Sequence, residues 1–195
     1  MSCCHGVWQV KSGLAMAEVL PFPGKQWLRL RIELLGVSPL VWRRFVVPRK
    51  VTLPKLHRVI QEVMGWEDYH LHEFVIAGQR YGLPDPEFDW GEQPLSEKRV
   101  TLDKSLAESG SFQYLYDFGD GWEHRVMVEG RVPPEEAPDT FTCLAGENAC
   151  PPEDVGGPPG YMNYLEAISN PKHEAHGDML AWRGRFDPPR VSRRL

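Results

Sequence analysis

The 195-residue chain is long enough to bury one well-filled hydrophobic core. Its 42% hydrophobic and 25% charged residues are ordinary for a globular protein, and the net charge of −5 argues mildly against binding to nucleic acid or anionic membrane over the whole surface. The sequence shows no bilayer-spanning apolar run and no secretory signal, so we expect a cytoplasmic protein whose four cysteines stay reduced.

Residues 1–26 are predicted to form a flexible N-terminal arm, because they show glycine and proline breaks and no sustained hydrophobic period. The run Cys3-Cys4-His5 contains metal-ligand residue types, but adjacent ligands on a loose terminus hold an ion poorly. We therefore expect residues 27–195 to form a single domain.

The domain opens with a predicted ββα unit. Strict alternation of apolar and charged residues over Trp27 to Leu34 predicts a first strand, and Val41 to Val47 a second. Thr52 is a suitable N-cap for a helix with Pro54 in its first turn, and Gly65 is placed to end that helix.

The rest of the chain contains shorter elements. We expect a strand over Tyr69 to Ala77, an irregular segment over Tyr81 to Pro94, a short strand and helical turn over Val100 to Leu106, a proline-rich linker near residues 133–138, and helices over Tyr161 to Ser169 and His173 to Trp182. This order predicts an α+β fold, with a largely antiparallel sheet and small C-terminal helices that cap it.

A β-hairpin is predicted over Ser111 to Gly130, where two alternating stretches flank the tripeptide Gly119-Asp120-Gly121. A two-residue turn at Asp120-Gly121 would set aromatic side chains opposite charged ones. A three-residue loop with Gly121 left-handed instead sets Phe118 opposite Trp122 and directs one apolar face to the core, and we adopt this register.

In that register Tyr116 faces His124, and Asp117 faces Glu123. Opposed carboxylates cost stability unless they share a proton or a cation. Asp117, Glu123 and His124 are therefore our catalytic candidates, as acid and base or as metal ligands. The structural alternative is that Asp117 caps the loop, Glu123 pairs with Arg125, and His124 is a core histidine.

Two histidines supply candidate metal ligands. His70 and His72 lie two residues apart on a predicted strand and thus on one face, a spacing that can chelate a metal ion. That face also carries Phe74 and Ile76, so a buried, hydrogen-bonded histidine is the alternative.

Glu153 and Asp154 are the remaining candidate metal ligands. They precede Gly156-Gly157, which lets the backbone approach another segment closely. We expect this loop either to close over the hairpin tip and complete a pocket, or to act as a rigid lid on the core.

The first two strands and the helix are rich in basic residues, with Glu33 the one acidic residue between Trp27 and Ile60. This stretch is a candidate surface for binding a protein or nucleic-acid partner. The alternative is that its charges are only exposed to solvent and bind no partner. Its cations are Arg29, Arg31, Arg43, Arg44, Arg49, Lys50, Lys55 and Arg58.

Five short motifs occur in series: Pro39-Leu-Val-Trp-Arg-Arg, Met64-Gly-Trp, His70-Leu-His-Glu-Phe, Tyr116-Asp-Phe-Gly-Asp-Gly-Trp-Glu-His and Ala149-Cys-Pro-Pro-Glu-Asp-Val-Gly-Gly. On these motifs the chain, from about Trp27 to Asp187, resembles the plasmid pRiA4b ORF-3-like family. The resemblance implies an α+β fold and an origin often alongside plasmids and transposable elements, and it implies no established activity. The arginine-rich end after Pro189 departs from the acidic tail of such proteins.

Two functions are carried forward. The preferred one is an accessory or binding module of a mobile element. The alternative is a metal-assisted hydrolase with a divalent ion at the hairpin. Phosphate-binding-loop, dinucleotide-binding, serine-hydrolase and HExxH zinc-protease motifs are absent from the sequence, so those enzyme classes are unsupported.

Overall fold

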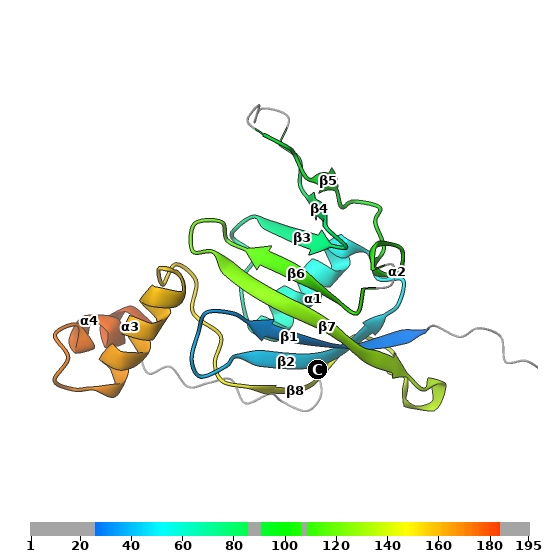
Figure 1. Ribbon diagram of the computed structural model, residues 1–195. Coiled ribbons are helices and arrows are strands. Elements are labelled where there is room, and N and C mark those ends of the chain that lie inside the picture. Colours follow the sequence, from blue (N-terminus) through cyan, green and yellow to red (C-terminus); the bar gives the residue numbers. More distant parts are fainter. Residues whose placement is uncertain (1–25, 86–90, 107–108, 184–195) are drawn as a thin grey trace, which may run out of the picture.

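The computed structural model describes residues 26–85, 91–106 and 109–183 (Figure 1). The predicted arm over residues 1–26 and the arginine-rich end therefore lie almost wholly outside the described residues. In chain order the elements are β1 Trp27–Leu34, β2 Trp42–Pro48, α1 Leu53–Met64, β3 His72–Ile76, β4 Gln79–Gly82, β5 Leu95–Ser96, α2 Leu102–Ser105, β6 Ser111–Tyr116, β7 Trp122–Val132, the 3-10 turn η1 Pro134–Glu136, β8 Thr142–Glu147, α3 Gly157–Ser169 and α4 His176–Arg183.

One twisted sheet carries all the strands, in the order β5-β4-β3-β6-β7-β1-β2-β8. Every neighbouring pair is antiparallel except β4 and β5. Helix α1 lies across one face of this sheet, and α3 and α4 lie beyond one end of it, near the β6–β7 turn (Figure 1). The predicted α+β class with a largely antiparallel sheet is confirmed.

The ββα opening forms as its sequence predicts. The apolar residues of β1 alternate inward, so that Leu30 and Ile32 are fully buried. Helix α1 begins after Thr52, and Gly65 ends it in the left-handed conformation with a φ of 94°. The inner stripe of α1 packs on the sheet and forms the centre of the core; it consists of Leu53, Leu56, Ile60, Val63 and Met64.

The predicted hairpin exists, but its register is wrong. Tyr116 faces Trp122, and Tyr114 faces His124, so the loop is Asp117–Gly121 and not Gly119–Gly121. Glu123 is opposite Leu115 and not opposite Asp117. The same side chains still point inward, because the predicted and observed registers differ by two residues and side chains alternate with a period of two.

Two further predictions about the hairpin loop have different outcomes. Gly121 has a φ of 69°, which confirms the predicted left-handed conformation. Phe118 was predicted to lie on the apolar face opposite Trp122, but it sits in the longer loop with 53% of its surface exposed. The backbone N–H of Gly121 donates to the carbonyl of Asp117 at 2.7 Å and closes that loop.

Several element limits differ from the prediction. Strand β3 begins at His72, so His70 precedes it and has no strand neighbour that fixes its face. Strand β8, which pairs with β2 at the sheet edge, was missed because its sequence has little alternation and follows a proline-rich segment. Both C-terminal helices are present, and Tyr161 and Tyr164 of α3 reach the core.

Candidate functional site

Four of the seven candidate residues converge beside the hairpin tip. The Nε2 atom of His70 lies 3.2 Å from Asp154 Oδ1 and 3.6 Å from Asp117 Oδ2. It lies 3.9 Å from Glu153 Oε2. One ligand atom each of His70, Asp117 and Asp154 falls within a mutual distance of 4.8 Å. We call His70, Asp117, Glu153 and Asp154 the tip cluster.

Asp117 is oriented by its own loop. It has a φ of 54°, a left-handed conformation that Asp tolerates better than most residues. Its Oδ1 atom accepts hydrogen bonds from the backbone N–H groups of Gly119 at 2.9 Å and Asp120 at 3.3 Å. Because Oδ1 is occupied in this way, Oδ2 is the atom that faces His70.

Glu153 is oriented in the same manner from a different part of the chain. Its Oε1 atom accepts hydrogen bonds from the backbone N–H of Glu67 at 2.9 Å and the hydroxyl of Tyr116 at 3.0 Å. Burial and this carboxylate raise the pKa of the Tyr116 hydroxyl, which therefore remains a donor. Glu153 is only 4% exposed, and its Oε2 atom is buried with no hydrogen-bond partner among the described residues.

Close backbone packing brings the loop of Glu153 to the hairpin. The N–H of Gly156 donates to Asp120 Oδ2 at 3.1 Å. A Cβ atom on Gly157 would lie 2.4 Å from the carbonyl oxygen of Asp120, so only glycine permits this approach. The predicted close approach at Gly156-Gly157 is found, and what it faces is the hairpin tip (Figure 1).

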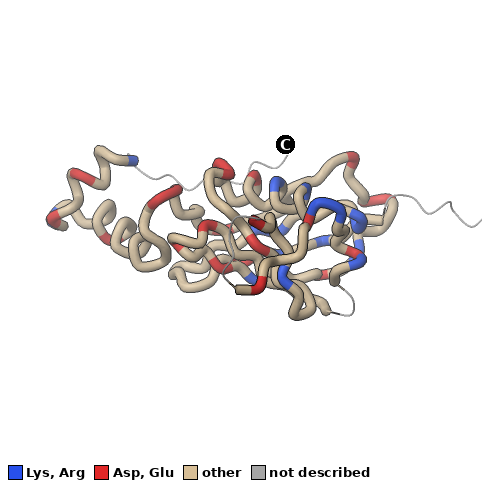
Figure 2. Tube along the Cα trace, turned by 90° about the horizontal axis from the view of Figure 1, so that it is seen from above, with Lys and Arg blue, Asp and Glu red and all other residues tan. Residues whose placement is uncertain are grey.

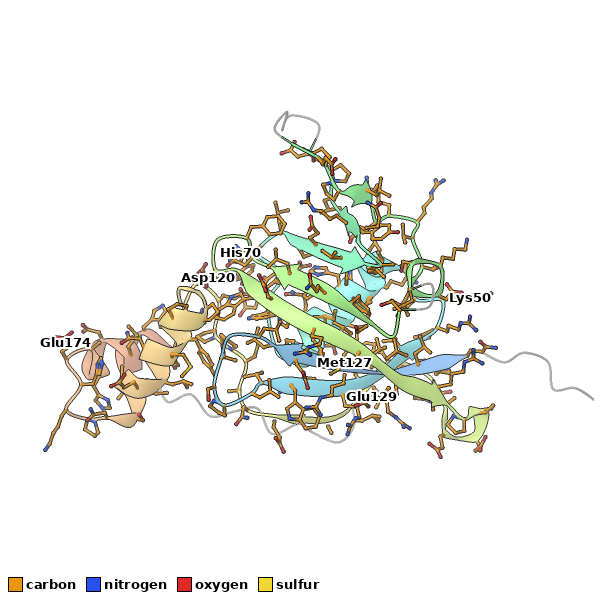
Figure 3. The ribbon with its side chains drawn as sticks, viewed as in Figure 1. Lys50, His70, Asp120, Met127, Glu129 and Glu174 are labelled. Atoms are coloured by element: carbon orange, nitrogen blue, oxygen red, sulfur yellow. The ribbon has the colours of Figure 1, made fainter. Side chains whose placement is uncertain are left out.

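One side of the tip cluster is exposed to solvent and the other side is buried. The side chain of Asp154 is 68% exposed, while Glu153 and Asp117 are buried. His70 Nε2 is itself buried and has no hydrogen-bond partner among the described residues. Buried polar atoms normally form hydrogen bonds, so two that form none within the described residues, and that face one another among the carboxylates around His70, indicate room for a ligand. Figure 3 labels both His70 and Asp120 at this end of the sheet.

The predicted catalytic trio is not assembled. Glu123 is exposed on the sheet face opposite to the core, where Leu115 is its cross-strand neighbour. His124 is fully buried, and burial lowers the pKa of its imidazole to about 4. Of the trio, Asp117 alone belongs to the tip cluster, while His124 is a core histidine whose Nδ1 atom lies 3.1 Å from the carbonyl oxygen of Tyr114.

His72 is not a partner of His70 in a chelate. Its Nε2 atom lies 3.0 Å from Glu97 Oε2, and its ring stacks on His57 with centroids 3.5 Å apart and planes 7° apart. His57 in turn hydrogen-bonds Tyr114 at 2.8 Å and Asp68 at 2.7 Å. We call His57, His72, Glu97, Asp68 and Tyr114 the interior cluster.

Sequence reasoning missed the residues that hold the tip cluster in place. Tyr116 was assigned only to the core, yet its hydroxyl donates to Glu153 and accepts from the N–H of Tyr69 at 3.1 Å. A tyrosine placed directly before Asp117 on an inward-facing strand position was the available signal, since a buried tyrosine hydroxyl usually has a partner.

Three arginines of the basic stretch, all on β1 and β2, are engaged within their own sheet. Arg31 pairs with Glu33 at 2.8 Å, and Arg44 pairs with Glu129 at 2.6 Å. Arg43 is buried and donates to backbone carbonyls, among them that of Val63 at 3.0 Å. Arg31 and Arg44 are thus held in ion pairs and Arg43 in backbone hydrogen bonds, and the predicted partner surface over the strands stays a prediction.

Similar proteins identify the family. The family model described as plasmid pRiA4b ORF-3-like protein matches residues 26–194. The chain belongs to the plasmid pRiA4b ORF-3-like family. Its similarity to a Sinorhizobium fredii (strain NBRC 101917 / NGR234) protein, "Uncharacterized protein y4hQ", is 45% identity over 162 residues, which is 82% of each chain.

A solved structure shares the fold. The crystal structure titled "Protein of Unknown Function MM3350", from Methanosarcina mazei Go1, matches with a TM-score of 0.74 and 37% identity, and it covers 86% of this chain and 98% of that one. The pRiA4b ORF-3-like model and these relatives carry no stated activity, and they lend no support to the hydrolase alternative. Among the residues that the structure describes, none of the helices has the length and apolar character to cross a bilayer.

Proposed function

We propose that this pRiA4b ORF-3-like protein is a binding module that holds a divalent metal ion in the tip cluster. The observation that carries the proposal is the pair of Glu153 Oε2 and His70 Nε2, which are buried, form no hydrogen bond within the described residues and lie 3.9 Å apart, with Asp154 Oδ1 3.2 Å from the same His70 atom. A cation between them would satisfy both, whereas neither forms a hydrogen bond with the described part of the chain.

The ligand set suits a first-row divalent ion. One imidazole and three carboxylates offer mixed nitrogen and oxygen donors, which are compatible with manganese, zinc or nickel. In each buried carboxylate, one oxygen accepts hydrogen bonds from groups outside the tip cluster. These bonds orient the second oxygen of the same carboxylate toward the proposed ion. Asp117 and Glu153 both follow this pattern.

The proposal is one of binding and not of hydrolysis. Glu123 and His124, which the hydrolase hypothesis required as base and acid, lie outside the tip cluster. The word plasmid in the family description supports an association with mobile genetic elements, which we include in the proposal. A cytoplasmic location is also part of it, and the free thiols of Cys143 and Cys150 support this.

The test is metal analysis of protein purified without chelator, followed by calorimetric titration with manganese or zinc. We expect stoichiometric binding to the wild type and an affinity at least about 100-fold lower for Asp117→Asn, because a charged ligand is lost. At a free metal concentration of about 100 times Kd, binding should stabilise the wild type by about 2.7 kcal/mol.

Glu123→Gln is the matched control. It removes the same charge from the same hairpin, but on the sheet face away from the tip cluster. Without metal, Asp117→Asn should melt higher than the wild type, because it relieves repulsion among three carboxylates. A wild type that takes up no metal, or equal losses of affinity in both variants, would refute the proposal.

A further inference from the structure

A second functional surface lies at the opposite end of the sheet from the tip cluster. Lys and Arg gather toward one end of the molecule in Figure 2, and Lys50 lies at the far end from His70 and Asp120 in Figure 3. Two chain segments meet there, residues 49–58 and residues 98–104.

The two segments are joined by backbone pairing. Thr52 and Thr101 form an isolated antiparallel bridge, the N–H of Leu53 donates to the carbonyl of Val100 at 2.9 Å, and the N–H of Leu102 donates to the carbonyl of Val51 at 2.9 Å. The bridge sets the two segments side by side, so the cations of both segments gather at this end of the sheet (Figure 2), where Lys55 and Arg58 also line a groove with Glu62 and Asp139. The sequence did not reveal this, since the segments are separated by the whole of β3, β4 and β5.

This surface is strongly basic, and most of its positive charges form no ion pair with the described part of the chain. The two segments carry seven Lys and Arg residues and a single acidic residue, Asp103. Apart from Arg49, the cations are exposed, and none of these six forms an ion pair with the described part of the chain. We call these six the basic corner: Lys50, Lys55, Arg58, Lys98, Arg99 and Lys104.

The basic corner contrasts with the strand arginines of the same protein. Arg31 and Arg44, on β1 and β2, are paired with Glu33 and Glu129. Unpaired like charges repel one another and weaken the compact state. The basic corner also surrounds the first turn of α1, which contains no acidic side chain, so the positive end of the helix dipole adds to its potential.

We propose that the basic corner binds the phosphate backbone of nucleic acid. A surface of clustered, unpaired cations is complementary to a chain of regularly spaced phosphates, and such contacts are independent of base sequence. An anionic membrane is the less suitable partner, because none of the exposed large hydrophobic side chains in the described ranges belongs to either basic segment. This surface does not depend on a metal in the tip cluster.

The experiment measures fluorescence anisotropy of a labelled DNA duplex of about 20 base pairs as salt is raised from about 50 to about 200 mM. If about four phosphates are contacted, log affinity should fall with log salt at a slope of about −3.6, or about 100-fold over this range. Lys98→Ala with Arg99→Ala should reduce the slope to about −1.8.

Arg125→Ala with Lys172→Ala is the control, since it removes two exposed cations outside the two segments, one of which, Arg125, lies 4.0 Å from Glu33. We expect the wild-type slope for this control. The proposal is overturned if the wild type fails to bind at about 50 mM salt, or if the control loses as much as the test variant. Tighter binding to vesicles of anionic phospholipid than to the duplex would overturn it in favour of a membrane surface.

Discussion

The tip cluster and the interior cluster are built from the same residue types, yet they differ in what their histidines contact. His70 and His72 are two residues apart in the sequence. His72 is buried against Glu97 and stacks on His57, so its partners come from the protein. His70 faces three carboxylates and has no hydrogen-bond partner on Nε2 within the described residues.

The difference shows how composition alone fails to separate a binding site from a structural network. In the interior cluster Tyr114 hydrogen-bonds both His57 and Gln61, and its aromatic ring packs in the core. In the tip cluster the supporting hydrogen bonds engage Asp117 Oδ1 and Glu153 Oε1 and leave the opposite oxygens free. We therefore infer that the interior cluster stabilises the fold and propose that the tip cluster binds a ligand.

The largest expected effect is that of Gly157→Ala, which attacks the tip cluster through the backbone. Gly157 has a φ of 67°, and its added Cβ would meet the carbonyl of Asp120 at 2.4 Å. We expect the free energy of unfolding to fall by about 3–4 kcal/mol, from backbone strain plus displacement of the hairpin tip. Chemical denaturation measures this change, and metal titration should show weaker binding.

Gly177→Ala is the control for that substitution. Gly177 lies in α4, and a Cβ placed there meets nothing within 4 Å. It should leave stability unchanged or raise it slightly, because alanine favours helix. Equal destabilisation by both substitutions would contradict the proposed docking of the hairpin on the Glu153 loop.

Acid should lower the free energy of unfolding of the metal-free protein by about 3 kcal/mol, because buried imidazoles resist protonation. Burial lowers the pKa of His124 from 6.5 to about 4 and also lowers that of His57, where the neighbouring His72 adds to the effect. Between pH 6.5 and about 4 the unfolded chain takes up a proton on His124 that the native chain does not, so stability falls as the pH falls through this window.

The measurement is denaturant unfolding at a series of pH values, beside His124→Gln. The wild type should lose stability progressively below about pH 6.5. The variant starts from a lower stability and should show a shallower slope, because one titrating group is gone. Parallel pH profiles would contradict this expectation, because they would mean that the pKa of His124 does not change on folding.

Tyr114→Phe is expected to give the smallest loss of stability among these predictions. It also tests whether the interior cluster and the tip cluster act independently. The change removes the hydroxyl shared by His57 Nδ1 and Gln61 Nε2 and leaves both without that partner. We expect a loss of about 2 kcal/mol, typical of unsatisfied buried polar groups. Metal affinity of the tip cluster should be unchanged, and a large loss of affinity would show that the clusters act as one unit.

Local signals in the sequence were sufficient to predict the ββα unit at the start of the domain. They also predicted which side chains of the β6–β7 hairpin point into the core. Alternation over Trp27–Leu34 predicted β1 with its observed limits, and Thr52 with Gly65 predicted the two ends of α1. Those features depend on side-chain periodicity and on capping, which act over a few residues. The inward face of β6 and β7 was predicted for the same reason.

Other features depended on the tertiary structure. Registers that differ by two residues bury the same faces, so the pattern could not choose between loops Gly119–Gly121 and Asp117–Gly121. The choice decided which carboxylate accompanies Asp117. Strand β8 was missed because its own sequence has little alternation, and only its pairing with β2 shows that it is a strand.

The sequence by itself determined an α+β domain and the residue types from which a metal site can be built. Tertiary structure alone decided that His70, Asp117, Glu153 and Asp154 meet, and that Glu123, His124 and His72 do not join them. The physical reason is that a site with ligands from three separate loops depends on long-range packing. Here that packing is the contact of Gly157 with Asp120, which places one loop against another.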